Sequence, residues 1–143
     1  MARAEVRVEL GAWDELVHEA TPIRHAVFVQ EQGVPAEIEL DEWDPLSLHA
    51  IARDGDGRAI GTGRLLPDGH IGRMAVLRTA RGSGAGTAIL LALMDAARGR
   101  GHREVVLNAQ THAAPFYRRL GFVEEGDVFD DAGIPHIAMR RRL

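Results

Sequence analysis

The chain has 143 residues, a length that predicts one domain with a single hydrophobic core. All 17 basic residues are arginine and no cysteine occurs, so lysine Schiff bases, lysine-dependent phosphate loops, disulfides and cysteine nucleophiles are excluded. The lack of cysteine suits a cytoplasmic protein. A formal net charge of -4 gives no broad basis for binding nucleic acid, and no apolar run is long enough to predict a membrane span.

The first half of the chain predicts helices between strands. Alternating charged and apolar residues near the N-terminus indicate a half-buried strand, and the glycine and aspartate residues at 54–57 indicate a hairpin turn. Between residues 13 and 32, apolar side chains recur every three or four positions, and Thr21-Pro22 resembles a second helix start. The expected elements are a strand over 3–10, two short helices over 13–32, and an antiparallel meander of strands over 48–52, 59–66 and 70–77.

The second half begins with a long amphipathic helix over residues 84–100, in which Ile89, Leu93 and Ala97 share one face. The elements expected after it are a strand over 104–108, a helix over 113–120, and strands over 122–125 and 134–140. This order predicts an α/β (α+β) fold, with a mixed, mostly antiparallel central sheet and helices on both faces. We expect one domain over residues 1–143.

A glycine-rich loop, Arg81-Gly-Ser-Gly-Ala-Gly86, precedes the long helix. Glycines let backbone amides approach an anion closely, and the helix start adds unpaired N–H groups and the positive end of the helix dipole. The loop therefore suits a phosphate or pyrophosphate, although a helix entry without any ligand is the alternative. The loop lacks the lysine of an NTPase phosphate loop, and Thr87 replaces the third glycine of a dinucleotide fingerprint.

Two motifs together resemble the GNAT superfamily of N-acetyltransferases. Arg81, Gly84 and Gly86 match the acetyl-CoA loop of that superfamily, and Phe116-Tyr117 followed by Leu-Gly-Phe matches its second signature. The resemblance covers nearly the whole chain, since the order of elements is also that of the GNAT fold. A further similarity to the ElaA/YjcF-like branch lies in residues 24–32, 39–41 and 133–139.

The resemblance implies that acetyl-CoA binds as a co-substrate, and no metal is expected because the sequence holds no close set of metal ligands. The strand backbone would pair with the pantetheine arm, the loop would hold the pyrophosphate, and Tyr117 would donate a proton to the departing thiolate. A phenol stays protonated at neutral pH and can act as a general acid. The implied acetyl-CoA residues are Met74, Ala75, Val76, Arg78, Arg81, Gly82, Ser83, Gly84, Ala85, Gly86, Thr87, Asn108, Gln110, Phe116 and Tyr117.

The implied reaction is direct transfer of acetyl to a primary amine of a small molecule or peptide, and it needs a group that takes the amine's proton. His112 and His136 are candidates because imidazoles exchange protons near neutral pH, and three acids are alternatives. The acidic stretch between Arg24 and Arg53 is either a rim that attracts a cationic amine or a solvated loop. The residues expected on the acceptor side are Phe28, Glu31, Glu39 and Asp41.

Other functions stay open at this point. A non-catalytic acyl-CoA sensor or interaction module would keep the glycine loop and lack productive base chemistry, and a nucleotide-binding α/β protein is a third reading. No close set of metal ligands is found in the sequence. A homodimer is expected by analogy with GNAT relatives alone.

Overall fold

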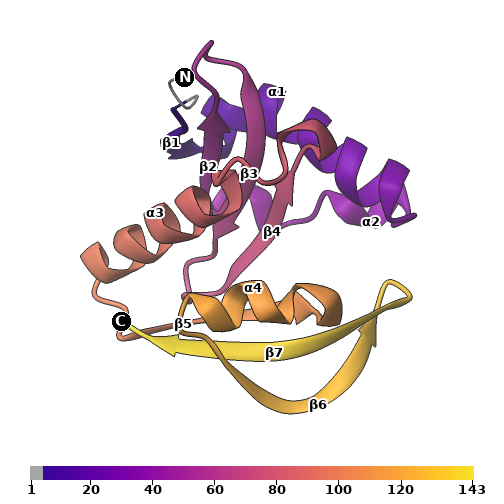
Figure 1. Ribbon diagram of the computed structural model, residues 1–143, viewed down its shortest axis with the longest axis vertical. Coiled ribbons are helices and arrows are strands. Elements are labelled where there is room, and N and C mark those ends of the chain that lie inside the picture. The colour runs from indigo at the N-terminus through magenta and orange to yellow at the C-terminus, as the bar shows by residue number, and fades with distance from the viewer. Residues whose placement is uncertain (1–4) are drawn as a thin grey trace.

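The computed structural model describes residues 5–143, and its elements follow the expected order along the chain (Figure 1). The strands are β1 (Arg7–Ala12), β2 (Leu48–Arg53), β3 (Ala59–Leu65), β4 (Ile71–Val76), β5 (Glu104–Gln110), β6 (Val123–Asp131) and β7 (Ile134–Arg142). The α-helices are α1 (Trp13–Arg24), α2 (Ala36–Glu39), α3 (Ala85–Gly99) and α4 (Ala114–Arg119). A π-helix, η1 (His25–Glu31), continues α1, and short 3₁₀ turns are η2 (Asp44–Leu46), η3 (Arg78–Ala80) and η4 (Thr111–Ala113).

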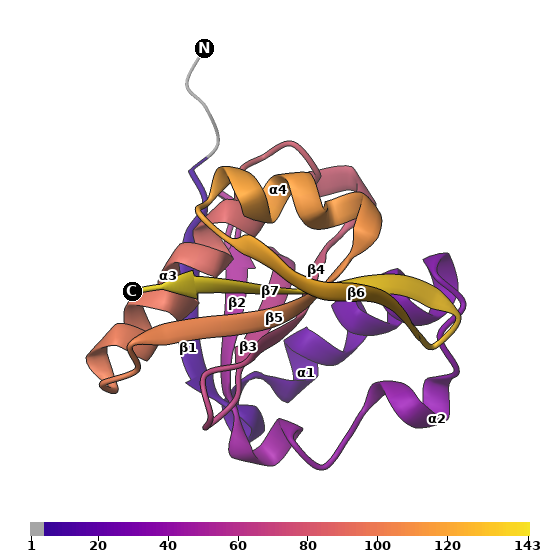
Figure 2. The same cartoon turned by 90° about the horizontal axis from the view of Figure 1, so that it is seen from below.

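The strands form two antiparallel sheets where the sequence predicted one. The first sheet has the order β1-β2-β3-β4 and the second β5-β7-β6, with β7 in the middle (Figure 2). The two sheets meet at one parallel bridge between His70 and Val106. The predicted fold class, a mixed and mostly antiparallel α/β fold, is confirmed, and the separation of β4 from β5 opens a cleft between the sheets.

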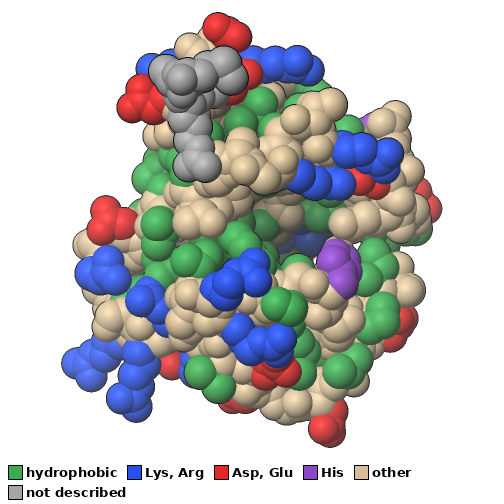
Figure 3. Space-filling view, viewed as in Figure 1, with side chains coloured by type: hydrophobic (Ala, Val, Ile, Leu, Met, Phe, Trp, Pro, Cys, Tyr) green, Lys and Arg blue, Asp and Glu red, His purple; other side chains and the backbone are tan. Residues whose placement is uncertain are grey.

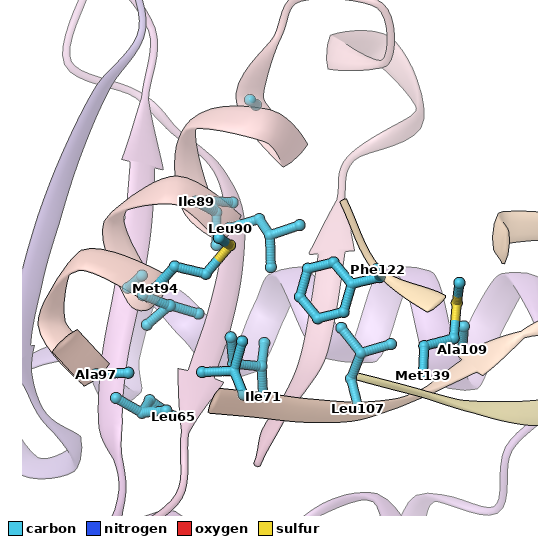
Figure 4. Close-up of a cluster of buried hydrophobic side chains, with 14 of the residues drawn as sticks. Leu65, Ile71, Ile89, Leu90, Met94, Ala97, Leu107, Ala109, Phe122 and Met139 are labelled. Atoms are coloured by element: carbon cyan, nitrogen blue, oxygen red, sulfur yellow. The ribbon is translucent and has the colours of Figure 1, made fainter. Parts of the chain in front are cut away.

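Helices cover both faces of the first sheet. Side chains along β2 alternate between the two faces, so apolar residues of this strand reach both cores. Ala50 and Ala52 face the larger core with α3, whereas Ile51 faces the smaller core with α1. In the larger core, Ile89, Leu90 and Met94 of α3 pack with Leu65, Ile71, Leu107, Phe122 and Met139 (Figure 4). The predicted apolar face of α3 is therefore buried, and it holds the two sheets together.

The first helical region differs from the prediction. The helix does not restart at Thr21-Pro22 but runs through Pro22 to Arg24 and widens into the π-helix η1. A proline inside a helix removes one hydrogen bond. Here the apolar stripe, which includes Leu16, Ala20 and Ile23, stays buried across the proline, and this burial outweighs the lost bond.

Several strand ends differ from the predicted bounds by one or two residues, and the start of the first strand and the end of the sixth differ by more. The first strand begins at Arg7 and extends to Ala12, and residues 3 and 4 of the predicted strand lie outside the described part of the chain. Strand β6 reaches Asp131, six residues beyond the expected end, because its backbone pairs with β7 although all nine of its side chains are exposed. Side-chain patterning alone gives no signal for such a strand.

Candidate active site

A cleft of about 810 Å³ lies between the two sheets, with walls from η1, β4, β5 and β7. Figure 3 shows the hollow, with arginine and acidic side chains gathered on its upper rim and a histidine at its mouth. The structure thus brings together most of the residues singled out from the sequence. Those that line the cleft are Phe28, Glu31, Glu39, Met74, Ala75, Val76, Arg78, Arg81, Asn108, Gln110, His112, Tyr117 and His136.

A bulge in β4 shapes the middle of the cleft. Thr62 pairs with Ala75 and Arg64 pairs with Gly72, so Arg73 and Met74 together lie opposite the single residue Gly63. A Cβ on Gly63 would lie 2.8 Å from Met74 Sδ, which explains the glycine there. The bulge interrupts the β3–β4 ladder next to the predicted pantetheine strand.

The glycine loop turns the chain from β4 into α3. Gly82 and Gly84 have φ values of 84° and 89°, in the left-handed region that favours glycine, and a Cβ on either would meet no atom within 4 Å. Ser83 Oγ accepts a hydrogen bond of 3.3 Å from the amide of Ala85. The amides of Gly86 and the next residue belong to the first helical turn and have no partner within the helix.

Three candidate segments meet beside this loop. A Cβ on Gly86 would lie 3.5 Å from Phe116 and 3.8 Å from Val76, so the start of α3, the end of β4 and helix α4 are neighbours. The predicted loop residues 82–87 and Phe116 are absent from the cleft lining but adjoin its β4 end through these contacts. An anion at the loop would therefore sit at one end of the cleft.

Two arginines at this end are tied to η1. Arg81 Nη2 donates to Glu31 Oε1 at 2.8 Å and Arg81 Nε to the carbonyl of Val76 at 3.2 Å, while Arg78 Nη2 lies 3.5 Å from Glu31 Oε2. Slight burial raises the pKa of Glu31, but the hydrogen bond and charge of Arg81 outweigh it and hold that pKa below its usual value. Glu31, predicted on the acceptor side, is paired with the predicted phosphate arginines.

Tyr117 lines the cleft from α4. Its ring packs edge-on against Phe116 and Phe122, with centroids 5.0 Å and 5.9 Å away. Burial raises the pKa of the Tyr117 phenol to about 12. The phenol is therefore protonated throughout the physiological range, as a proton donor must be.

The two candidate histidines have different surroundings. His136 is 9% exposed, stacks on Phe129, and its Nδ1 lies 2.7 Å from the carbonyl oxygen of Ile134. Because a carbonyl only accepts, Nδ1 carries the proton, and Nε2 of the neutral ring holds the free lone pair. His112 lies exposed in η4 at the cleft edge.

Two polar side chains on β5 also line the cleft. Asn108 is exposed there, and Gln110 donates a hydrogen bond of 2.8 Å to Gln32 at the end of η1. This amide pair connects the two walls of the cleft.

A closed ring of three arginines and three carboxylates, here called the arginine–carboxylate ring, forms the floor beside β4. Each member contacts two of opposite charge, at N–O distances of 2.6 to 3.4 Å. In order around the ring, the members are Arg24, Glu39, Arg73, Asp41, Arg64 and Asp44. Arg64, Arg73 and Glu39 line the cleft, and the other three members lie behind them.

Burial would raise the pKa values of Asp41 and Asp44, but hydrogen bonds from Arg64 and Arg24 respectively outweigh it and keep both below their ordinary value. Both carboxylates are therefore ionised at neutral pH, and the ring carries three charges of each sign.

Comparison with known proteins assigns the family. The sequence matches the acetyltransferase (GNAT) domain over residues 16–143. The chain belongs to the GNAT acetyltransferase family.

Among relatives, the uncharacterized N-acetyltransferase YjcF of Bacillus subtilis is 42% identical over 132 residues, covering 90% of this chain and 94% of YjcF. An acyl-CoA N-acyltransferase from Pseudomonas aeruginosa superposes with a TM-score of 0.82 at 33% identity, over 96% of this chain and 99% of that one. Escherichia coli ElaA gives a TM-score of 0.82 at 27% identity, with the same coverage. These relatives agree with the ElaA/YjcF-like branch, and this GNAT chain is an acyltransferase.

The arginine–carboxylate ring of this GNAT chain changes the interpretation of its acidic stretch. Glu39 and Asp44 are 5% and 1% exposed, so they form neither a solvated loop nor an open acidic rim. Their partners are arginines far away in the sequence. Asp41, predicted to meet the acceptor, is likewise paired with Arg64 and Arg73 and lies behind the cleft surface.

Sequence reasoning missed Arg64, Arg73 and Gln32 as residues of the GNAT cleft. An arginine inside the otherwise apolar run of β3 was the available signal for Arg64, since a buried charge requires a partner. Nothing in the local sequence marks Arg73, whereas Gln32 ends the segment 24–32 that resembles the ElaA/YjcF-like branch. Within residues 5–143, no group of three or more acidic or histidine side chains could hold a metal, and no helix is long and apolar enough to cross a membrane.

Proposed function

We propose that this chain transfers an acetyl group from acetyl-CoA directly to a primary amine while both substrates are bound. The observation that carries this proposal is the convergence of the bulged strand β4, the loop arginines, Tyr117 and His136 on one cleft. The name of the Pseudomonas aeruginosa relative, an acyl-CoA N-acyltransferase, supports acyl-CoA as donor. Holding two reactants in one site removes much of the entropic part of the barrier.

The glycine loop suits the pyrophosphate of CoA. Positions 82 and 84 open onto free space, the first turn of α3 supplies unpaired amides, and Arg81 stands beside them. The backbone of Met74, Ala75 and Val76 would add the pantetheine arm to the edge of β4 like an extra strand, which gives affinity independent of side chains. Asn108 and Gln110 face this strand from β5 across the cleft.

In the chemical step, the neutral amine nitrogen attacks the thioester carbonyl carbon and a C–N bond forms. The ammonium proton passes to Nε2 of His136, directly or through water, and the C–S bond then breaks. The sulfur takes the phenolic proton of Tyr117, so the products are the amide and the free thiol of CoA. The proton held by His136 then returns through solvent to the phenolate, which restores both side chains.

We assign the base to His136 and not to His112 because hydrogen bonding fixes its ring and leaves Nε2 free. The acidic alternatives are weaker candidates, since Glu31, Glu39 and Asp41 are each paired with arginine. No acetyl-enzyme is expected, because the chain has no cysteine to carry the acyl group.

A thiol-release assay with acetyl-CoA and a panel of amines tests this function, together with calorimetric titration of CoA. We expect saturable heat with CoA and thiol release with at least one amine class. If CoA binding gives heat but no amine leads to thiol release, the enzyme hypothesis is wrong and the chain is a non-catalytic acyl-CoA-binding module. A homodimer and a cytoplasmic location stay predictions, which sedimentation and fractionation address.

A further inference from the structure

Arg73 adopts a strained backbone at the centre of the cleft. Its φ of 48° lies in the left-handed region, which long side chains rarely adopt. Such strain persists only where the surroundings impose it, and it concentrates at functional sites. Here Arg73 Nε donates to the carbonyl of Glu39 and Nη2 to Asp41, both at 3.2 Å, and these bonds hold the guanidinium at the cleft surface.

Arg73 is the ring arginine that a ligand can reach. Its side chain is 30% exposed, against 1% for Arg24 and 6% for Arg64, and it lines the cleft. Its contacts within the ring, at 3.2 and 3.4 Å, are also the longest. Within residues 5–143 its Nη1 donates no hydrogen bond, so one edge of the guanidinium is free to bind an acceptor group.

The arginine–carboxylate ring leaves one buried arginine nitrogen without a hydrogen-bond partner among the described residues. Arg64 Nε is buried and has no hydrogen-bond partner in the described part of the chain, although Nη1 and Nη2 are held by carboxylates. Burial, followed by the neighbouring charge of Arg64, lowers the pKa of Arg73. The two cleft-facing arginines therefore repel each other, and an anion beside them would relieve this repulsion.

Two of the carboxylates that line the cleft are already paired with arginines. Glu31 pairs with the loop arginines, and Glu39 belongs to the ring, so neither is free to bind a second positive charge on an acceptor. Asp131 is the remaining cleft carboxylate within residues 5–143, and it is exposed at the end of β6. Among the described residues of the floor, the group available to a ligand is therefore the Nη1 donor of Arg73, which suits an anionic acceptor group.

We infer that Arg73, with Arg64 behind it, binds a carboxylate of the acceptor, so that the acceptor is an amine carrying a carboxylate, such as a free amino acid. A planar guanidinium matches a carboxylate through two parallel hydrogen bonds. Arg73 directly precedes Met74 in the strand assigned to the pantetheine arm, so this contact orients the amine along the acyl donor. The inference rests on the proposed acetyl transfer and specifies its acceptor.

The test compares matched acceptors in the thiol-release assay: free amino acids, their carboxamides, and the amines that lack the carboxyl group. For wild-type protein we expect kcat/KM to be at least about tenfold higher for an amino acid than for its carboxamide. Arg73→Gly removes the guanidinium and readily adopts the φ of 48°. It should raise KM for the amino acid by about tenfold or more and abolish the preference, while Arg73→Lys retains part of it.

Arg100→Gln is the matched control, because Arg100 is exposed beyond the end of α3 and outside the cleft. Calorimetric binding of CoA checks the fold of every variant. Equal turnover of amino acids and carboxamides by wild-type protein, or a preference for diamines that Asp131→Asn removes, would overturn the carboxylate site and leave acetyl transfer standing. Absence of thiol release from any amine would overturn acetyl transfer itself, and this inference with it.

Discussion

Glu31 Oε1 accepts a hydrogen bond of 2.8 Å from Arg81 Nη2, so the end of η1 is tied to the residue that opens the glycine loop. Glu31 thus places a negative charge beside the proposed pyrophosphate site. Glu31→Gln should tighten CoA binding by roughly three- to tenfold at low salt, because Arg78 and Arg81 are then less neutralised. Calorimetric titration at two salt concentrations measures this change.

Pantetheine, which lacks the phosphates, serves as the control ligand for Glu31→Gln and should bind with unchanged affinity. Glu37→Gln, at an exposed position outside the cleft, controls for the loss of one negative charge. Weaker CoA binding by Glu31→Gln would show that Glu31 positions the arginines instead of competing for them.

Tyr117→Phe removes the phenolic hydroxyl, keeps the aromatic ring, and so tests the role of Tyr117 as proton donor. The ring packing against Phe116 and Phe122 is retained, so CoA affinity should stay within about twofold of wild type. The rate kcat should fall roughly 100-fold, a typical contribution of a general acid. Since the pKa of Tyr117 is raised to about 12, wild-type kcat should show no loss from this group up to pH 9. Unchanged kcat in the variant would remove Tyr117 from the mechanism.

The sequence predicts those parts of the site that are formed by consecutive residues. The loop from Arg81 to Gly86 and the Phe116-Tyr117 pair are local motifs, and their positions follow from the elements on either side. Strand β4 and helix α3 likewise have clear periodicity, so their order places the loop at a helix start.

The arginine–carboxylate ring could not be predicted in this way. It joins residues from 24 to 73, and which arginine meets which carboxylate depends on how α1, α2, β3 and β4 pack. The local charge pattern therefore predicted only that the acidic stretch is either a solvated loop or a rim that attracts a cationic amine. The strain at Arg73 is likewise not evident from the local sequence, because the β4 bulge depends on the register between β4 and β3, in which Arg73 and Met74 lie opposite Gly63.

Gly84→Asp tests the anion site against a matched position on the same helix. Gly84 precedes α3 with φ 89°, Gly101 follows it with φ 85°, and a Cβ on either meets no atom within 4 Å. Aspartate should therefore cost similar stability at both, on the order of 1 kcal/mol. Only Gly84→Asp should weaken CoA binding, by at least about tenfold, because its carboxylate repels the phosphates and competes for the amides. Equal CoA affinity in the two variants would refute the pyrophosphate placement.

The buried histidine under the ring should make stability depend on pH in two stages. His49 is 1% exposed and its Nε2 donates to the carbonyl of Asp44 at 2.8 Å. Burial lowers the pKa of His49 from the ordinary 6.5, so the unfolded chain binds its proton first. Its contribution to stability is full above pH 6.5 and declines as pH falls below that value.

The depressed pKa values of Asp41 and Asp44 act in a lower window, with full stabilisation above the ordinary 3.8 and loss as pH falls further. Urea unfolding from pH 7.5 to 3 should therefore show an upper decline of at most about 1.4 kcal/mol per pH unit from one proton, and a lower decline in acid. His49→Gln should remove the upper decline only. His18→Gln, at an exposed position of α1, should keep both declines. An upper decline of the same slope in His49→Gln would assign it to another group, because glutamine cannot take up the proton.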